Sequence, residues 1–136
     1  MKIRGEVVGE IRAGFLILLG VGKDDAETDA DWLADKIVSL RVFEDQQGKL
    51  NLSLEDIKGE ILIVSQFTLY GDCRKGRRPG FDSAAAPEMA DRLYNYFVQK
   101  VKTKGLKVAT GKFQAMMDVE LTNQGPVTLI LDSKKN

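Results

Sequence analysis

Histidine is absent from this 136-residue sequence, and cysteine occurs only once, as Cys73. The absence of histidine excludes Ser-His-Asp and Cys-His catalytic arrangements and the usual zinc sites with imidazole ligands. A single cysteine cannot form a disulfide bond within the chain. Any catalysis must therefore use a base other than histidine, and we expect neither a cofactor nor a metal site.

Long apolar runs are also missing. No stretch approaches the roughly 18 apolar residues that a membrane-spanning helix needs, and Met1–Glu6 is too polar to begin a signal peptide. We therefore expect a cytoplasmic protein without membrane contact. Hydrophobic residues make up 43% of the chain and charged residues 29%. This composition predicts one globular domain over residues 1–136.

The charges cancel overall but are unevenly distributed. Residues 1–70 contain 8 basic and 13 acidic residues, whereas residues 71–136 contain 12 basic and 7 acidic residues. A polyanionic partner would therefore bind the second half of the chain. The alternative is a mixed surface without a partner.

The pattern of apolar residues predicts the main elements of the fold. The unbroken runs Phe15–Leu19 and Ile61–Val64 predict strands covered on both faces. Helical spacing predicts a helix over about 26–40 and a second one from Pro87 to near Gly105. Alternating or short apolar segments predict further strands over 5–11, 117–121 and 127–131. We expect two principal helices with mostly antiparallel or mixed β-sheets, an α+β fold.

Six acidic residues lie between Asp24 and Asp35, at the start of the first predicted helix. Negative charge is favourable there because of the helix dipole. A carboxylate metal site is the functional alternative.

Two short motifs, about 60 positions apart, carry further information. They are Ser65-Gln66-Phe67-Thr68-Leu69 and Asn123-Gln124-Gly125-Pro126-Val127-Thr128. Both resemble the signature of the D-aminoacyl-tRNA deacylase (D-tyrosyl-tRNA deacylase) family. The similarity continues at Lys49–Leu52, Arg78–Pro79 and Thr110–Gly111, and so covers essentially the whole chain.

The resemblance implies a homodimeric enzyme with a compact, barrel-like single domain and an active site near the subunit interface. Its substrate would be D-aminoacyl-tRNA, bound at the acceptor end, and its reaction the hydrolysis of the ester bond. Glycyl-tRNA is a further candidate substrate. Family members normally begin about a dozen residues earlier, with a strand that contains a Gln-Arg-Val segment. For that reason a non-catalytic RNA-binding module is the first alternative, and a purely structural dimer subunit is the second.

The resemblance also implies roles for the first motif. Backbone N–H groups around Phe67 and Thr68 would stabilise the oxyanion that develops on the ester, with Ser65 and Gln66 in the same catalytic site. Thr68 is either a positioning group or a nucleophile. The first role is chemically easier, because a threonine nucleophile needs an adjacent base. The alternative, which would have equal weight without the second motif, is that Ser65 and Thr68 merely end a strand.

The second motif would form the chirality filter. The resemblance implies a cis Gly125-Pro126 bond whose carbonyl groups accept hydrogen bonds from the substrate's α-ammonium and exclude L-amino acids by a clash. In the family, this pair reaches into the neighbouring subunit's pocket. Taken alone, the four residues of this turn would be read as an ordinary hairpin.

A basic loop follows the first motif and contains Arg74, Lys75, Arg77 and Arg78, which we call the loop cations. We expect them to bind phosphates of the tRNA acceptor end. The alternative is a solvated loop. Cys73, beside Arg74, is a candidate thiol of lowered pKa, although a lone loop cysteine is more often incidental.

Overall fold

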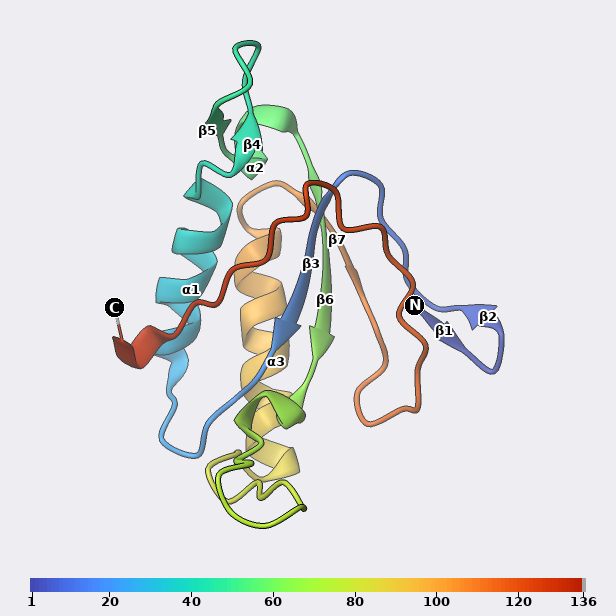
Figure 1. The fold of residues 1–136 in the computed structure, drawn as a ribbon, viewed down its shortest axis with the longest axis vertical. Coiled ribbons are helices and arrows are strands. Elements are labelled where there is room, and N and C mark those ends of the chain that lie inside the picture. The colour runs from blue at the N-terminus through green and yellow to red at the C-terminus, as the bar shows by residue number, and fades with distance from the viewer. Residues whose placement is uncertain (136) are drawn as a thin grey trace.

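A three-stranded parallel sheet forms the centre of the computed structural model, which describes residues 1–135. Its strands are β3 (Gly14–Leu19), β6 (Glu60–Ser65) and β7 (Lys107–Thr110), in the order β3-β6-β7. β3 and β6 pair in parallel, so that Leu19 lies opposite Ser65. All three strands therefore end at the same edge of the sheet (Figure 1).

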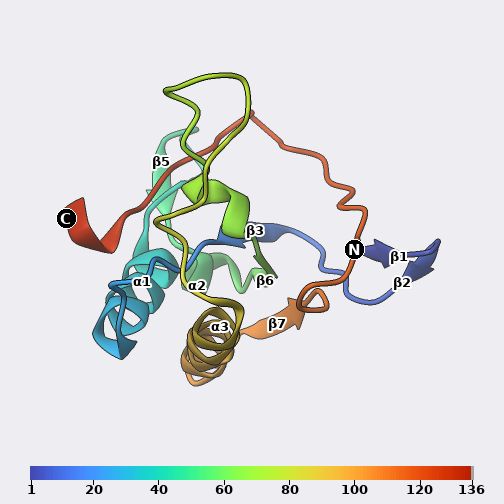
Figure 2. The ribbon, with the colours of Figure 1, turned by 90° about the horizontal axis from the view of Figure 1, so that it is seen from below.

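Two long helices cover one face of this sheet. α1 (Glu27–Ser39) and α3 (Pro87–Lys102) pack against each other there, as Figures 1 and 2 show. Ile61 and Ile63 of β6 point toward them and are fully buried, together with Phe97 of α3. Both helices agree with the predicted ones to within a few residues.

The opposite face is covered by the two ends of the chain. Leu62 and Val64 point to this side, where Met1, Met117 and Val119 pack against them. The prediction of a strand buried on both faces is therefore confirmed for Ile61–Val64. It is only partly right for Phe15–Leu19, because β3 is an edge strand and Leu18 is 44% exposed.

The remaining elements are short. Two antiparallel ladders join β1 (Lys2–Ile3) with β2 (Glu6–Val7) and β4 (Phe43–Glu44) with β5 (Leu50–Leu52). The strand predicted over 5–11 is therefore reduced to β2. A short third helix, α2 (Leu54–Ile57), was not predicted, although Ser53 and Asp56 form a capping box that the sequence displays.

The expected barrel-like arrangement is wrong. No sheet in residues 1–135 closes on itself, and the central sheet is parallel rather than antiparallel. The reason lies in the connections. Each step between neighbouring central strands passes through a helix, α1 or α3, and such crossovers connect parallel strands.

The strands predicted over 117–121 and 127–131 are also absent from the described structure. Residues 120–130 are exposed, and the only ladder contact of this region is an isolated antiparallel bridge between Lys2 and Asp118. Alternating apolar residues form a strand only where a neighbouring strand exchanges hydrogen bonds with them. The chain ends in a short 3₁₀ turn, η2 (Ser133–Lys135). None of the helices described has the length and apolar character that crossing a membrane requires.

Candidate functional site

The first motif lies where β6 leaves the parallel sheet. Ser65 is the last residue of β6, and the Gln66 N–H donates to the Leu19 carbonyl at 2.8 Å. The chain then turns into a 3₁₀ helix, η1 (Phe67–Tyr70). Functional sites of parallel sheets commonly lie at the carboxyl ends of the strands, and η1 occupies that edge in Figure 1.

The start of η1 presents two free backbone donors. Within the turn, the Leu69 N–H donates to the Gln66 carbonyl at 3.3 Å and the Gly71 N–H to the Thr68 carbonyl at 2.9 Å. The N–H groups of Phe67 and Thr68 have no acceptor among residues 1–135, as expected for the first turn of a helix. Two adjacent donors of this kind can stabilise an oxyanion.

The side chains around these donors differ in their contacts. The Gln66 amide donates to the Thr68 hydroxyl oxygen, which leaves the Thr68 proton available for donation. The Phe67 ring is 55% exposed and contacts Phe81 edge-to-face, with ring centroids 5.0 Å apart. Phe81 lies 14 positions along the chain, and the sequence pattern did not predict its contact with Phe67.

The loop cations lie on the loop between η1 and α3, and all four are exposed. Arg74 forms a two-point ion pair with Asp72, at 2.9 and 2.7 Å. The hydrogen bonds from Arg74 lower the pKa of Asp72. The remaining three form no ion pair within residues 1–135, and we call them the unpaired loop cations. They are Lys75, Arg77 and Arg78.

The second motif forms an exposed turn. The Gly125-Pro126 peptide bond is cis, as the resemblance implies. Gly125 has a φ of +121°, a conformation that disfavours residues with a side chain. The Asn123 side chain accepts a hydrogen bond from the Val127 N–H at 3.1 Å and donates to the Thr128 hydroxyl at 2.9 Å, so that it bridges the turn.

The two motifs do not meet within one chain. In Figure 1 the segment that follows Asp118 first runs over the end of the central sheet opposite to η1, and it then descends to η2, beside the cavity that Asp132 and Tyr70 line together. No hydrogen bond in residues 1–135 joins the two motifs. Ser65–Thr68 and the loop cations are therefore connected through the chain that leads from η1 into the loop, whereas no hydrogen bond in residues 1–135 connects Gly125 or Pro126 to either of them.

The acidic residues before and within α1 form hydrogen bonds and ion pairs with other groups of the chain. Asp25 accepts a hydrogen bond from the Gly22 N–H at 2.7 Å, and Asp29 accepts one from the Ala26 N–H at 2.8 Å, which caps α1. In the described part of the chain, no set of three or more cysteine or carboxylate side chains is arranged to hold a metal ion.

Comparison with known proteins gives the family of the chain. The profile of the family described as D-Tyr-tRNA(Tyr) deacylase matches residues 1–132. The D-aminoacyl-tRNA deacylase of Thermosipho melanesiensis is 60% identical over 136 residues, which are 99% of this chain and 91% of that protein. The protein of the same name from Clostridioides difficile is 62% identical over 129 residues, 95% of this chain and 87% of its own length.

One solved structure has the same fold as this chain. The protein described as c-Myc DNA Unwinding Element Binding Protein superposes with a TM-score of 0.90 at 38% sequence identity, over 96% of this chain and 89% of its own. The chain belongs to the D-Tyr-tRNA(Tyr) deacylase family.

Proposed function

We propose that this chain hydrolyses the ester bond of D-aminoacyl-tRNA and releases the free D-amino acid and tRNA. The observation that carries the proposal is the pair of free N–H groups of Phe67 and Thr68, at the carboxyl edge of the parallel sheet. They lie in the segment that this chain shares with the deacylase family. Because the reaction needs charged tRNA, we expect it to take place in the cytoplasm.

The reaction consists of one attack and one bond cleavage. A water molecule attacks the ester carbonyl carbon, and the carbonyl oxygen becomes negatively charged against the N–H groups of Phe67 and Thr68. The bond to the ribose oxygen then breaks, and that oxygen takes up the proton that the water loses. Each such N–H donor typically lowers the barrier by about 3 kcal/mol.

In this scheme, Thr68 is better suited to position the attacking water or the substrate than to act as the nucleophile. Its oxygen accepts a hydrogen bond from the Gln66 amide, and no histidine is available to deprotonate it. The threonine hydroxyl can instead donate to the attacking water or to the substrate. The neighbouring ribose hydroxyl of the substrate supplies a proton route that needs no protein base.

The chirality filter would come from a second copy of the chain. Gly125 and Pro126 lie on an exposed turn that has no hydrogen bond to η1 within residues 1–135, and their carbonyl groups can accept hydrogen bonds from an α-ammonium. Large apolar side chains are exposed on the same segment, namely Leu121, Val127, Leu129 and Ile130. Such a surface is typical of an interface between subunits. A two-fold homodimer would cover it and present each turn to the partner's η1.

The tRNA acceptor end would lie across the loop after η1. The unpaired loop cations are available for phosphate contacts, whereas Arg74 and Asp72 together carry no net charge. Phosphate contacts would position the substrate without selecting its sequence.

One experiment separates catalysis from RNA binding alone. Purified protein is incubated with D-tyrosyl-tRNA and with L-tyrosyl-tRNA, and tRNA binding and release of free tyrosine are measured in the same samples. The proposal predicts release of D-tyrosine and retention of L-tyrosyl-tRNA. Binding of both tRNAs without release of either amino acid would establish the non-catalytic alternative.

A further inference from the structure

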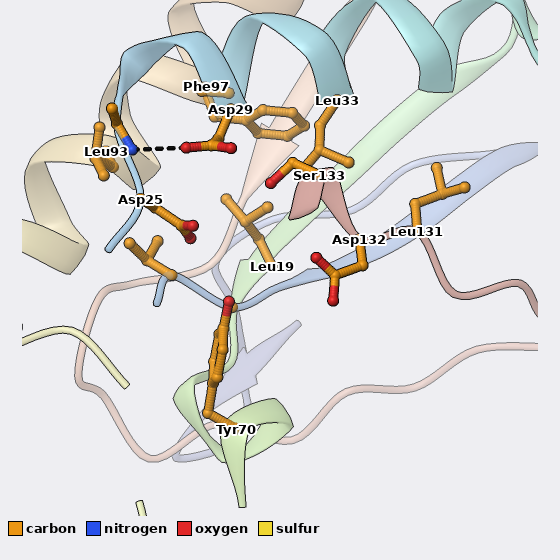
Figure 3. Close-up of a pocket in the computed structure, with 14 residues that line it drawn as sticks. Leu19, Asp25, Asp29, Leu33, Tyr70, Leu93, Phe97, Leu131, Asp132 and Ser133 are labelled. Atoms are coloured by element: carbon orange, nitrogen blue, oxygen red, sulfur yellow. Dashed lines mark hydrogen bonds between the residues drawn. The ribbon is translucent and has the colours of Figure 1, made fainter. Parts of the chain in front are cut away.

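A small cavity of about 60 Å³ lies behind η1, where the end of the chain meets the start of α1 (Figure 3). Its floor is apolar and includes Leu19 and Phe97, whereas its rim carries three carboxylates, those of Asp25, Asp29 and Asp132. The Asp25 and Asp29 side chains are largely buried, with 14% and 15% of their surface exposed. Carboxylates placed in this way need a counter-charge.

Lys134 is the cation that supplies this counter-charge. Its ammonium lies 3.1 Å from an Asp29 carboxylate oxygen and 3.8 Å from an oxygen of Asp25. It also donates to the Asp24 carbonyl at 3.3 Å. Asp132 accepts a hydrogen bond from the Lys134 backbone N–H at 2.9 Å. One ammonium group therefore holds η2 against the start of α1 and pairs with two carboxylates of the rim, those of Asp25 and Asp29.

Tyr70 of η1 forms the opposite wall of the cavity. Its ring lies against the backbone that leads from β3 to α1, since a Cβ added to Gly22 would stand 2.7 Å from the Tyr70 hydroxyl oxygen. Burial raises the pKa of Tyr70, and the carboxylates of Asp25 and Asp132 raise it further. The functional turn η1 and the end of the chain thus share one acidic cavity.

The segment between Asp118 and Lys134 has few other attachments to its own chain. At its beginning, Lys2 and Asp118 exchange two backbone hydrogen bonds of 2.8 Å. Residues 120–130 are then exposed and form no strand. At its end, Leu131 packs at the margin of the main core and Lys134 makes its ion pairs. The position of Gly125 and Pro126 is therefore determined mainly at these two ends.

We propose that Lys134 is a positioning residue, which holds the segment carrying Gly125 and Pro126 at the acidic cavity behind η1. It thereby determines how far the Gly125-Pro126 turn, the proposed chirality filter, extends toward the partner's η1. The inference rests on the proposed function. It requires no contact between Lys134 and the substrate. The ammonium acts through the chain that it holds in place.

The test compares Lys134→Met with Lys134→Arg and with the matched control Lys135→Met. The Lys135 side chain forms no ion pair within residues 1–135. Backbone hydrogen exchange of peptides covering 119–132 reports on the attachment, and the ratio of D- to L-tyrosyl-tRNA hydrolysis rates reports on selectivity. Lys134→Met should exchange faster in this segment and lower the ratio at least tenfold. Lys134→Arg and Lys135→Met should behave as the wild type.

Two results would overturn the inference. In the first, exchange over 119–132 is unchanged in Lys134→Met, so that the ion pairs do not hold the segment. In the second, exchange rises but the ratio of rates stays within twofold of the wild type, so that the attachment does not affect selectivity. A wild-type protein without D preference would instead refute the proposed function, and the exchange experiment would still decide whether Lys134 holds the segment.

Discussion

Replacing Phe67 with proline should remove one oxyanion donor while leaving η1 in place. Phe67 is the first residue of η1, a position at which proline is tolerated because the N–H has no partner within the helix. Gln66 has φ −140° and ψ 83°, which lies outside the α region that a following proline disfavours. The change therefore removes an N–H group that has no acceptor in residues 1–135.

The expected loss follows from the number of donors. Among residues 1–135, the N–H groups of Phe67 and Thr68 are the two at the start of this turn that have no acceptor, so Phe67→Pro removes one of two. One donor typically contributes about 3 kcal/mol to the barrier, which corresponds to a decrease in kcat of about 100- to 1,000-fold. The assay is single-turnover release of D-tyrosine from D-tyrosyl-tRNA at saturating enzyme.

Phe67→Ala is the matched control. It removes the ring that contacts Phe81 but keeps the backbone N–H. We expect this variant to bind substrate less tightly and to keep kcat within about tenfold of the wild type, which is less than the loss of an oxyanion donor. If both variants lost the same activity, the ring rather than the N–H group would be responsible, and the proposed oxyanion site would be wrong.

Three further predictions concern the nucleophile, the RNA surface and acid stability. Thr68→Ala should retain measurable D-selective turnover, and a complete loss in a folded variant would favour the nucleophile role. Neutralising the three unpaired loop cations with glutamine should flatten the slope of log affinity against log salt by about 2 to 3. The neutral double change Arg74→Gln with Asp72→Asn should leave that slope as it is, and equal slopes in all variants would remove the loop from the tRNA site. Burial acts to raise the pKa of Asp29, but hydrogen bonds from Ala26, Ser133 and Lys134 together outweigh it, so the pKa is lowered. Its contribution to stability is present above about pH 4 and is lost as pH falls through the lowered pKa. Urea unfolding of Asp29→Asn should accordingly depend less on pH below about 4 than the wild type does, and an unchanged pH dependence would count against this role of Asp29.

The elements that the sequence predicts well are those determined by local patterns. The run Ile61–Val64 and the helices α1 and α3 each bury residues that recur at the spacing of a strand or a helix. The cis bond before Pro126 was implied by the family resemblance and is present. The motif Ser65–Thr68 was expected at the end of a strand, and it lies there.

The features that the sequence did not predict depend on contacts between distant segments. The parallel order of the central sheet depends on which strands become neighbours, and alternation of residues does not encode this. Within residues 1–135, the alternating segment 117–121 pairs with a strand only at Asp118, through the bridge to Lys2 of β1, and remains irregular elsewhere. The ion pair of Lys134 with Asp29 joins residues 105 positions apart, and the packing of Tyr70 on Gly22 spans 48 positions. Neither has a local signal.

We propose that η1 of one chain and the Gly125-Pro126 turn of another form one active site. Two variants, each defective in one half of that site, test this directly. Phe67→Pro removes an oxyanion donor. Gly125→Ala places a Cβ 3.0 Å from a Val127 methyl group at a φ of +121°, which displaces the turn. Each variant alone should be impaired in release of D-tyrosine from D-tyrosyl-tRNA.

The decisive measurement is the activity of a purified heterodimer that contains one copy of each variant. If the turn serves the partner's site, one of the two sites in the heterodimer has an intact η1 and an intact turn. The account therefore predicts about half of the wild-type rate of D-tyrosine release per dimer, with D selectivity restored. If each turn served its own chain, both sites would remain defective, and a heterodimer no more active than the two parent variants would contradict the account.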